Sequence, residues 1–233
     1  MAVDVEHLYD QIHLRAEASI IEALDIVDEA FQQFRLEQLA FSFNGGKDCT
    51  VLLYLLAASL AKRRKSDKSY TPDAVTTVYF HRYDDEFSEL INFMHYITNK
   101  FGFALKTCHR AYREGLFELV RERPSLSAVF MGVRRSDPYC ENLSAFAPCD
   151  KGWPELVRIC PIIDLSYAEV WSFLKSFNLE YCSLYDSGYT SLGSMAETIP
   201  NPNLRINADG HKPAFMLEDG DQERAGRVPK GKS

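Results

Sequence analysis

Residues 41–50 read FSFNGGKDCT, and this short stretch decides the fold. A short apolar and aromatic run, Leu39 to Phe43, leads into it, and the apolar run TVLLYLLAASL follows it at 50–60. The first run has the length of a short strand, and the second has the length and composition of a largely buried helix. The stretch therefore predicts a strand, a glycine-rich turn and a helix, in that order.

The residues of this turn are suited to holding an anion. The first N–H groups of a helix have no partner within it, and the aligned peptide dipoles add positive charge there. Gly45 and Gly46 allow the backbone to curl so that successive N–H groups face a phosphate. Ser42 and Asn44 add side-chain hydrogen bonds, and Lys47 adds a positive charge. A glycine pair can also be a plain connector, but the flanking strand and helix favour phosphate binding.

Asp48 is acidic where a phosphate is expected, which leaves two interpretations. Its carboxylate either holds Mg²⁺ against the phosphate or caps the helix. The turn is not the G-x-x-x-x-G-K-[ST] loop, because its glycines are adjacent and the acid follows the lysine, and it is not a G-x-G-x-x-G dinucleotide turn. Cys49 stands near Lys47 at the helix start, where a thiol pKa can be lowered, but we interpret it as a packing residue.

Composition indicates one ordinary globular domain. The chain has 233 residues, of which 46% are hydrophobic and 25% are charged. A net charge of -7 argues against a broad nucleic-acid-binding surface. The six cysteines include no C-x-x-C pair, which favours reduced thiols, and we find no signal peptide, transit peptide or membrane span. We therefore expect a cytoplasmic protein that binds neither nucleic acid nor membranes.

The rest of the chain alternates between helical and strand-like segments. Helical spacing at 14–34, 89–101 and 113–123 alternates with strand-like runs at 74–80, 104–108 and 128–133. Further along, SYAE at 166–169 is a capping box before another helix. This alternation predicts an α/β fold with a parallel, twisted sheet and helices on both faces. Residues 134–157 show no period, and loops of that length are usually functional or disordered.

The glycine-rich stretch resembles the PP-loop, S-x-G-G-x-D-S/T, of the ATP pyrophosphatase (adenine nucleotide α-hydrolase-like) superfamily. Four further stretches follow it: GVRRSDPY (132–139), CDKGWP (149–154), LYDSGYTSLG (184–193) and NPNL (201–204). In this order they resemble FAD synthetases, or FMN adenylyltransferases, of the eukaryotic and fungal type. The resemblance implies transfer of AMP from ATP to the phosphate of FMN, giving FAD and pyrophosphate with the help of Mg²⁺. FMN and ATP would be its small-molecule partners, with transient transfer of FAD to apo-flavoproteins.

The resemblance also implies residue roles. It gives catalytic roles to Asn44, Asp48, Asp137 and Arg224, Mg²⁺ to Asp48 and Asp137, and flavin contacts to Asp137, Asp150, Arg224 and Arg227. The chemistry fits these residue types, because joining two anionic phosphates needs cations, which Lys47, Arg134 and Arg224 would supply. Gly188, Thr190, Ser191 and Gly193 predict a second phosphate-binding turn, and Trp153, Tyr139 or Phe146 would form an apolar wall for the flavin.

Simpler interpretations remain open for several of these residues. Asp137 precedes a proline and can simply start a turn. Trp153 can cap a core, and Arg224 can be a solvated charge. Ser187 in LYDSGY departs from the basic residue that relatives often carry, which puts phosphate binding by this loop in doubt. His81, Arg82 and the acidic cluster Asp84, Asp85 and Glu86 follow the strand-like run at 74–80 and are candidates for adenine or substrate contact.

Two other functions compete with FAD synthesis. A PP-loop reductase of phosphoadenylyl sulfate would need a cysteine near the C-terminus, and none follows Cys182. A non-catalytic protein that binds flavin or nucleotide would keep the pocket without turnover. We expect one domain over residues 1–233, with a core at about 14–204, a segment at 205–227 that closes over the substrate, and a flexible tail at 228–233.

Overall fold

The computed structural model describes residues 4–81, 85–207 and 210–228, and its centre is one sheet. The described strands are β1 (Leu39–Ser42), β2 (Thr76–Phe80), β3 (Leu105–Cys108), β4 (Ala128–Met131), β5 (Phe146–Pro148) and β6 (Val157–Ile159). Their order in the sheet is β3-β2-β1-β4-β6-β5. Neighbouring strands pair in parallel except for β5, which pairs antiparallel with β6. The predicted α/β fold is therefore confirmed, with one antiparallel strand at its edge.

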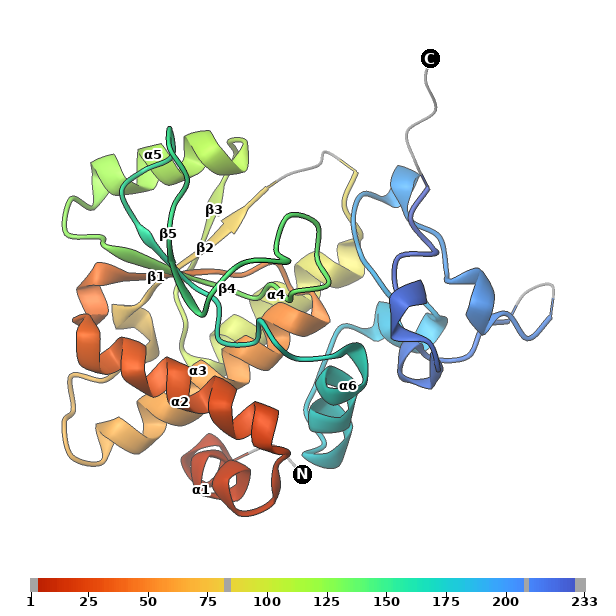
Figure 1. Cartoon of the computed structure of the whole chain (residues 1–233), viewed down its shortest axis with the longest axis horizontal. Coiled ribbons are helices and arrows are strands. Elements are labelled where there is room, and N and C mark those ends of the chain that lie inside the picture. Colours follow the sequence, from red (N-terminus) through yellow and green to blue (C-terminus); the bar gives the residue numbers. More distant parts are fainter. Residues whose placement is uncertain (1–3, 82–84, 208–209, 229–233) are drawn as a thin grey trace.

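Helices cover both faces of this sheet (Figure 1). They are α1 (Val5–Arg15), α2 (Ala18–Gln33), α3 (Lys47–Arg64), α4 (Ser88–Phe101), α5 (Tyr112–Glu122) and α6 (Tyr167–Ser176). Successive side chains of a strand point to opposite faces, so Leu39 and Phe41 enter the large core with α2 and α3, whereas Ala40 packs toward α5. Within the described residues, no helix is both long and apolar enough to cross a membrane.

Two local differences from the expected elements have clear causes. The helix predicted over 14–34 begins only at Ala18, because Ala16 and Glu17 adopt extended backbone, and most of the preceding helix α1 was not predicted. The short strand β5 lies inside the aperiodic stretch 134–157, where three residues give too little pattern to predict a strand. The capping box is present as predicted, with Ser166 and Glu169 each accepting a hydrogen bond from the other's backbone N–H.

The strand order changes direction at the carboxyl ends of β1 and β4. From β1 the chain adds β2 and β3 on one side, and β4 then returns to the other side of β1. Ser42 at the end of β1 lies opposite Met131 at the end of β4. Loops that leave such neighbouring strands in opposite directions open a ligand-binding crevice. The glycine-rich turn and the loop at 132–137 both start there.

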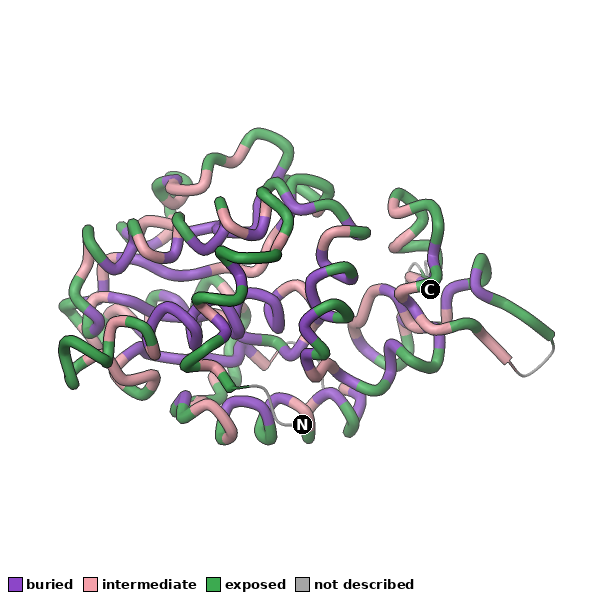
Figure 2. The backbone as a smooth tube through the Cα atoms, turned by 90° about the horizontal axis from the view of Figure 1, so that it is seen from below, coloured by how far each residue is buried: buried purple, intermediate pink, exposed green. Residues whose placement is uncertain are grey.

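The chain after α6 forms a lobe of short turns beside that helix (Figure 1, blue). Its 3-10 turns are Ser183–Ser187, Met195–Glu197, Pro202–Leu204, Ala214–Met216 and Gly220–Gln222. Figure 2 shows buried residues running through the centre of the sheet body, whereas this lobe carries many exposed residues. The Tyr167 hydroxyl of α6 donates to the Ala214 carbonyl at 2.7 Å, which fastens the lobe to the body.

Candidate active site

The glycine-rich turn bends at Gly45. Its φ of +70° lies in the left-handed region, and a Cβ there would come within 2.6 Å of Met94 Cγ. Gly46 has an ordinary φ of −63° and forms the N-cap of α3 without a side-chain cap. Asn44 is exposed, and its Oδ1 accepts a hydrogen bond from the Gly46 N–H at 3.0 Å. The tight bend therefore depends on Gly45 more than on Gly46.

The start of α3 is fixed by contacts from elsewhere in the fold. The Lys47 N–H donates to the hydroxyl of Tyr185 at 2.8 Å. The Cys49 thiol lies close to the carbonyls of Ser42 and Gly132, at 3.7 and 4.0 Å. Burial and then the charge of Asp48 raise the pKa of the Cys49 thiol to about 12. Cys49 is thus a neutral packing residue.

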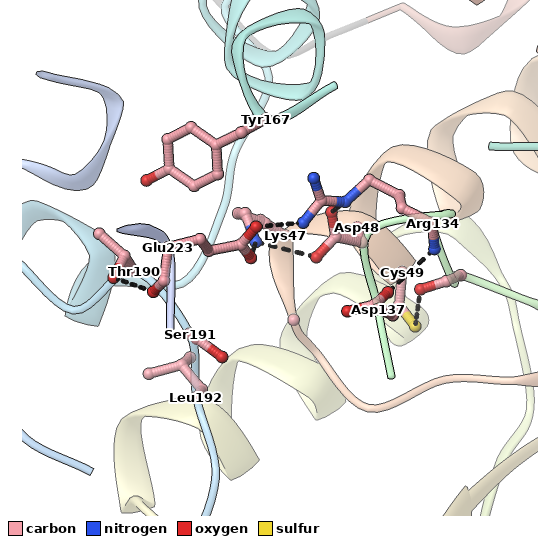
Figure 3. Close-up of polar contacts among 12 residues, drawn as sticks. Lys47, Asp48, Cys49, Arg134, Asp137, Tyr167, Thr190, Ser191, Leu192 and Glu223 are labelled. Atoms are coloured by element: carbon pink, nitrogen blue, oxygen red, sulfur yellow. Dashed lines mark hydrogen bonds and ion pairs between the residues drawn. The ribbon is translucent and has the colours of Figure 1, made fainter. Parts of the chain in front are cut away.

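Four charged side chains meet in front of this helix (Figure 3). Lys47 Nζ lies 2.9 Å from Asp48 Oδ2, and Arg134 Nε lies 2.7 Å from Asp48 Oδ1. Glu223, from the C-terminal lobe, accepts from both Lys47 Nζ and Arg134 Nη2. Lys47 is only 1% exposed and Arg134 only 2%. Two buried cations therefore share two carboxylates.

Burial and neighbouring charges have opposite effects on the pKa values in this cluster. Burial disfavours the charge of Asp48, but Lys47 and Arg134 outweigh burial and lower the pKa of its carboxyl group. Burial likewise opposes the charge of Arg134, yet Asp48 and Glu223 raise the pKa of its guanidinium. These groups stay ionised because each has an opposite charge in contact.

Asp137 lies beside the cluster in the loop after β4. Its Oδ2 accepts from the Arg134 backbone N–H at 2.9 Å, which closes the turn at 134–137. Burial, and after it the nearby charge of Asp48, raise the pKa of the Asp137 carboxyl group. The Asp137 carbonyl accepts from the Cys140 N–H at 3.1 Å, so Asp137 also starts the next turn while it faces the charged cluster, and the two interpretations of this residue are compatible.

The loop after β4 approaches α3 closely at Gly132. A Cβ on Gly132 would lie 2.7 Å from the Cα and 2.8 Å from the backbone nitrogen of Cys49. Backbone atoms cannot move aside as a flexible side chain can, so only glycine fits here. This close approach brings Arg134 to the first turn of α3.

The predicted second phosphate-binding turn contacts residues near the end of the same lobe. The Thr190 hydroxyl donates to the Glu223 carbonyl at 2.6 Å, and Arg227 Nε donates to Ser191 Oγ at 3.0 Å. A Cβ on Gly188 would meet His211, and one on Gly193 would meet the Arg227 guanidinium. Phosphate binding by these residues remains a prediction.

Asp150 lies on the surface, at the rim of a pocket of about 370 Å³. Its carboxylate forms an ion pair with Arg158 at 3.1 Å, and its side chain is 70% exposed. Tyr139 and Asn142 also line this pocket. Trp153 lies elsewhere, with its ring 6.1 Å from that of Tyr112 and packed against the core on the α5 side.

The remaining predicted residues have other surroundings. Arg224 is exposed. Asp85 holds the loop after Gly193, because its Oδ2 accepts from the Ala196 N–H at 2.9 Å. Glu86 accepts from the Tyr79 hydroxyl and lies 3.3 Å from His81 Nδ1. Arg82 and Asp84 are outside the described residues.

Sequence reasoning missed three residues that shape the site: Glu223, Tyr185 and Gly132. Glu223 stands in the polar run QERAGR, where no period shows that it points inward. Tyr185 and Gly132 belong to LYDSGYTSLG and GVRRSDPY, so those motifs already marked their neighbourhoods.

Comparison with known proteins places this chain in a family. The model of the phosphoadenosine phosphosulfate reductase domain matches residues 38–119 and 116–200. A probable FAD synthase of Schizosaccharomyces pombe is 40% identical over 88% of this chain and 77% of its own length. The chain belongs to the FAD synthase family. A probable FAD synthase of Caenorhabditis elegans is 37% identical over 88% of this chain, which spans only 40% of that protein.

A solved structure agrees with this family. Candida glabrata FMN adenylyltransferase, crystallised with FMN and the ATP analogue AMPCPP, matches with a TM-score of 0.83 and 26% identity. The match covers 96% of this chain and 97% of that one. The fold of this FAD synthase family member is therefore shared over nearly its whole length, including the C-terminal lobe that carries Glu223.

Proposed function

We propose that this chain is an FMN adenylyltransferase that joins the AMP part of ATP to the phosphate of FMN and releases pyrophosphate. One observation carries the proposal. Lys47, at the start of α3, and Arg134, in the loop after β4, point to the same place beyond the ends of two adjacent parallel strands. Such a pair of buried cations suits a polyphosphate better than a neutral ligand.

The PP-loop would hold the two outer phosphates of ATP. Gly45 and Gly46 bring the start of α3 close to the ligand, while Lys47 and Arg134 supply positive charge. The α-phosphorus then faces the nucleophile, whose attack breaks its bond to the bridging oxygen of the pyrophosphate. The two cations counter the repulsion between the ATP and FMN phosphates.

The site also fits Mg²⁺. Burial, and after it the charge of Asp48, raises the pKa of Asp137, so a bound cation would relieve the repulsion between these two carboxylates. Mg²⁺ commonly binds one or two carboxylates together with substrate phosphates. Asp48 and Asp137 would hold the ion, which would neutralise phosphate charge when bound.

The attacking group is the FMN phosphate, which is largely ionised at neutral pH and needs no general base. No thiol is required for this reaction. A reductase that acts through a cysteine would need an accessible thiol near the C-terminus, but the last cysteine, Cys182, is completely buried. This burial favours adenylyl transfer over the reductase chemistry.

The flavin would lie toward the loops at 134–154, where the pocket beside Asp150 offers polar edge contacts. Asp150 would hydrogen-bond the isoalloxazine ring. Trp153 would act indirectly by supporting the loop. Arg224 and Arg227 of the C-terminal lobe would close over the phosphates, and the FAD formed would pass transiently to cytoplasmic apo-flavoproteins.

Incubation of the full chain with FMN, ATP and MgCl₂, followed by chromatography, tests this function. We expect equal amounts of FAD and pyrophosphate to form, with little product when Mg²⁺ is chelated. Release of sulfite from phosphoadenylyl sulfate, with no FAD formed, would show that the chain is a reductase and not an FMN adenylyltransferase.

A further inference from the structure

Glu223 binds the same two cations that the proposed function assigns to phosphate. Its two carboxylate oxygens accept separately from Lys47 and from Arg134. Both cations are almost completely buried. A buried cation that already has a carboxylate partner can take a new anion only at the expense of that partner or at the cost of crowding two anions together.

Of the two carboxylates in the cluster, Glu223 is the one that can leave. Asp48 lies within the first turn of α3, so its backbone is fixed and its short side chain keeps the carboxylate close to the two cations. Glu223 follows the three-residue turn Gly220–Gln222 in the C-terminal lobe, where no regular helix or strand holds it. Short turns of this kind open at much lower cost than packed helices.

A small set of hydrogen bonds seats Glu223 in the cluster. The Thr190 hydroxyl donates to the Glu223 carbonyl, and Asn201 Nδ2 donates to the Gln222 carbonyl at 2.8 Å. Asn201 Nδ2 also donates to Thr190 Oγ1 at 2.9 Å. Thr190 and Asn201 are both buried. These bonds hold the backbone at 222–223 close to the cluster. The Glu223 carboxylate therefore has a high effective concentration at Lys47 and Arg134.

We propose that Glu223 is a built-in competitor for the phosphate site and sets its selectivity, a proposal that rests on the proposed function of that site. A polyphosphate displaces the Glu223 carboxylate from Lys47 and Arg134 because it offers more negative charge and more oxygen atoms to the same cations. A singly charged anion does not, because it gains no more from the two cations than the tethered carboxylate already provides.

Calorimetric titration of the full chain with sodium pyrophosphate tests this competition. Glu223→Gln removes the charge, and the matched control Glu218→Gln changes an exposed glutamate of the same lobe. We expect Glu223→Gln to bind pyrophosphate about tenfold more tightly than the unmodified chain, since one competing charge-assisted contact is lost. We expect Glu218→Gln to bind as the unmodified chain does.

Hydrogen exchange on the unmodified chain provides a test that needs no variant. Saturating pyrophosphate should increase amide exchange over residues 220–227. The displaced Glu223 carboxylate then no longer ties this segment to Lys47 and Arg134 of the sheet body. This result decides the proposal if Glu223→Gln fails to fold because Asp48 alone is left to neutralise the two buried cations. Unchanged exchange, or a folded Glu223→Gln with equal or weaker pyrophosphate affinity, would overturn the proposal.

Neither readout depends on turnover. If the unmodified chain forms no FAD while Glu223→Gln still binds pyrophosphate more tightly, the proposed function fails and the competition stands. If FAD forms and pyrophosphate affinity is insensitive to Glu223, the competition fails and the proposed function stands.

Discussion

The Nε atom of Arg134 lies 2.7 Å from Oδ1 of Asp48, and this ion pair joins the loop after β4 to the first turn of α3. The two residues follow the ends of two neighbouring parallel strands, β1 and β4, so the strand order brings them together. Because Arg134 is buried, its charge needs a lasting partner. Asp48 thus orders the site as well as being a proposed Mg²⁺ ligand.

Asp48→Asn should destabilise the protein, and the effect should depend on pH. The pKa of Asp48 lies below its usual 3.8, so its charge stabilises the fold above about pH 4 and this contribution is lost as the pH falls further. At pH 7 we expect a loss of about 3–5 kcal/mol in the free energy of unfolding, the usual cost of breaking a buried ion pair.

Urea unfolding at several pH values measures this difference. The gap between the unmodified chain and Asp48→Asn should be largest near pH 7 and should shrink below about pH 4. Asp73→Asn, at an exposed position, serves as the control. A gap that stays constant from neutral to acidic pH would show that the charge of Asp48 does not stabilise the fold.

The two glycines of the turn should differ in their tolerance of alanine. Gly45→Ala places a side chain at φ +70° and against Met94, so we expect a loss of about 1–3 kcal/mol in unfolding free energy. Gly46→Ala keeps an ordinary φ and should cost less than about 1 kcal/mol. Thermal unfolding of the two variants gives the comparison. Equal losses of unfolding free energy would show that the bend depends on both glycines.

The hydroxyl of Tyr185 should contribute to the stability of the fold. Tyr185→Phe leaves the buried Lys47 N–H without its acceptor, which typically costs about 1–3 kcal/mol. Tyr181→Phe is a matched control, because that ring also packs on Trp171 but its hydroxyl bonds the exposed Asp186. Denaturant unfolding should separate the two variants, and a Tyr185→Phe protein as stable as the control would mean that water replaces the hydroxyl.

Asp150→Ala should weaken FMN binding far more than ATP binding. Its ion pair with Arg158 lies at the surface and contributes at most about 1 kcal/mol to stability, so folding should be unaffected. Glu155→Ala, an exposed acid in the same loop, is the control. Equilibrium titrations with each substrate give the two affinities, and equal losses for FMN and ATP would remove Asp150 from the flavin site.

The central part of the fold could be predicted because local patterns specify it. The strand before Gly45, the helix after it and the capping box at Ser166 each follow from a few adjacent residues. The motifs also named Arg134 together with Lys47 and Asp48, and the structure brings Arg134 into contact with Asp48 although the two lie far apart in the sequence.

The lobe could not be predicted in the same way. Glu223 reaches the site from a segment without helical or strand period, and its inward position depends on Thr190 and Asn201. Asn44 turns toward the Gly46 N–H, which no local pattern indicates. Contacts of this kind arise from the folded arrangement of distant segments, so sequence spacing carries no signal for them.

Isotope tracing tests the central claim most directly, namely that the PP-loop holds the outer phosphates and exposes the α-phosphorus. The full chain is incubated with FMN, MgCl₂ and ATP labelled at either the α- or the γ-phosphate, and the products are separated. We predict that the α label appears in FAD and the γ label in pyrophosphate. The γ label in a flavin product, or the α label left only in ADP, would contradict this account.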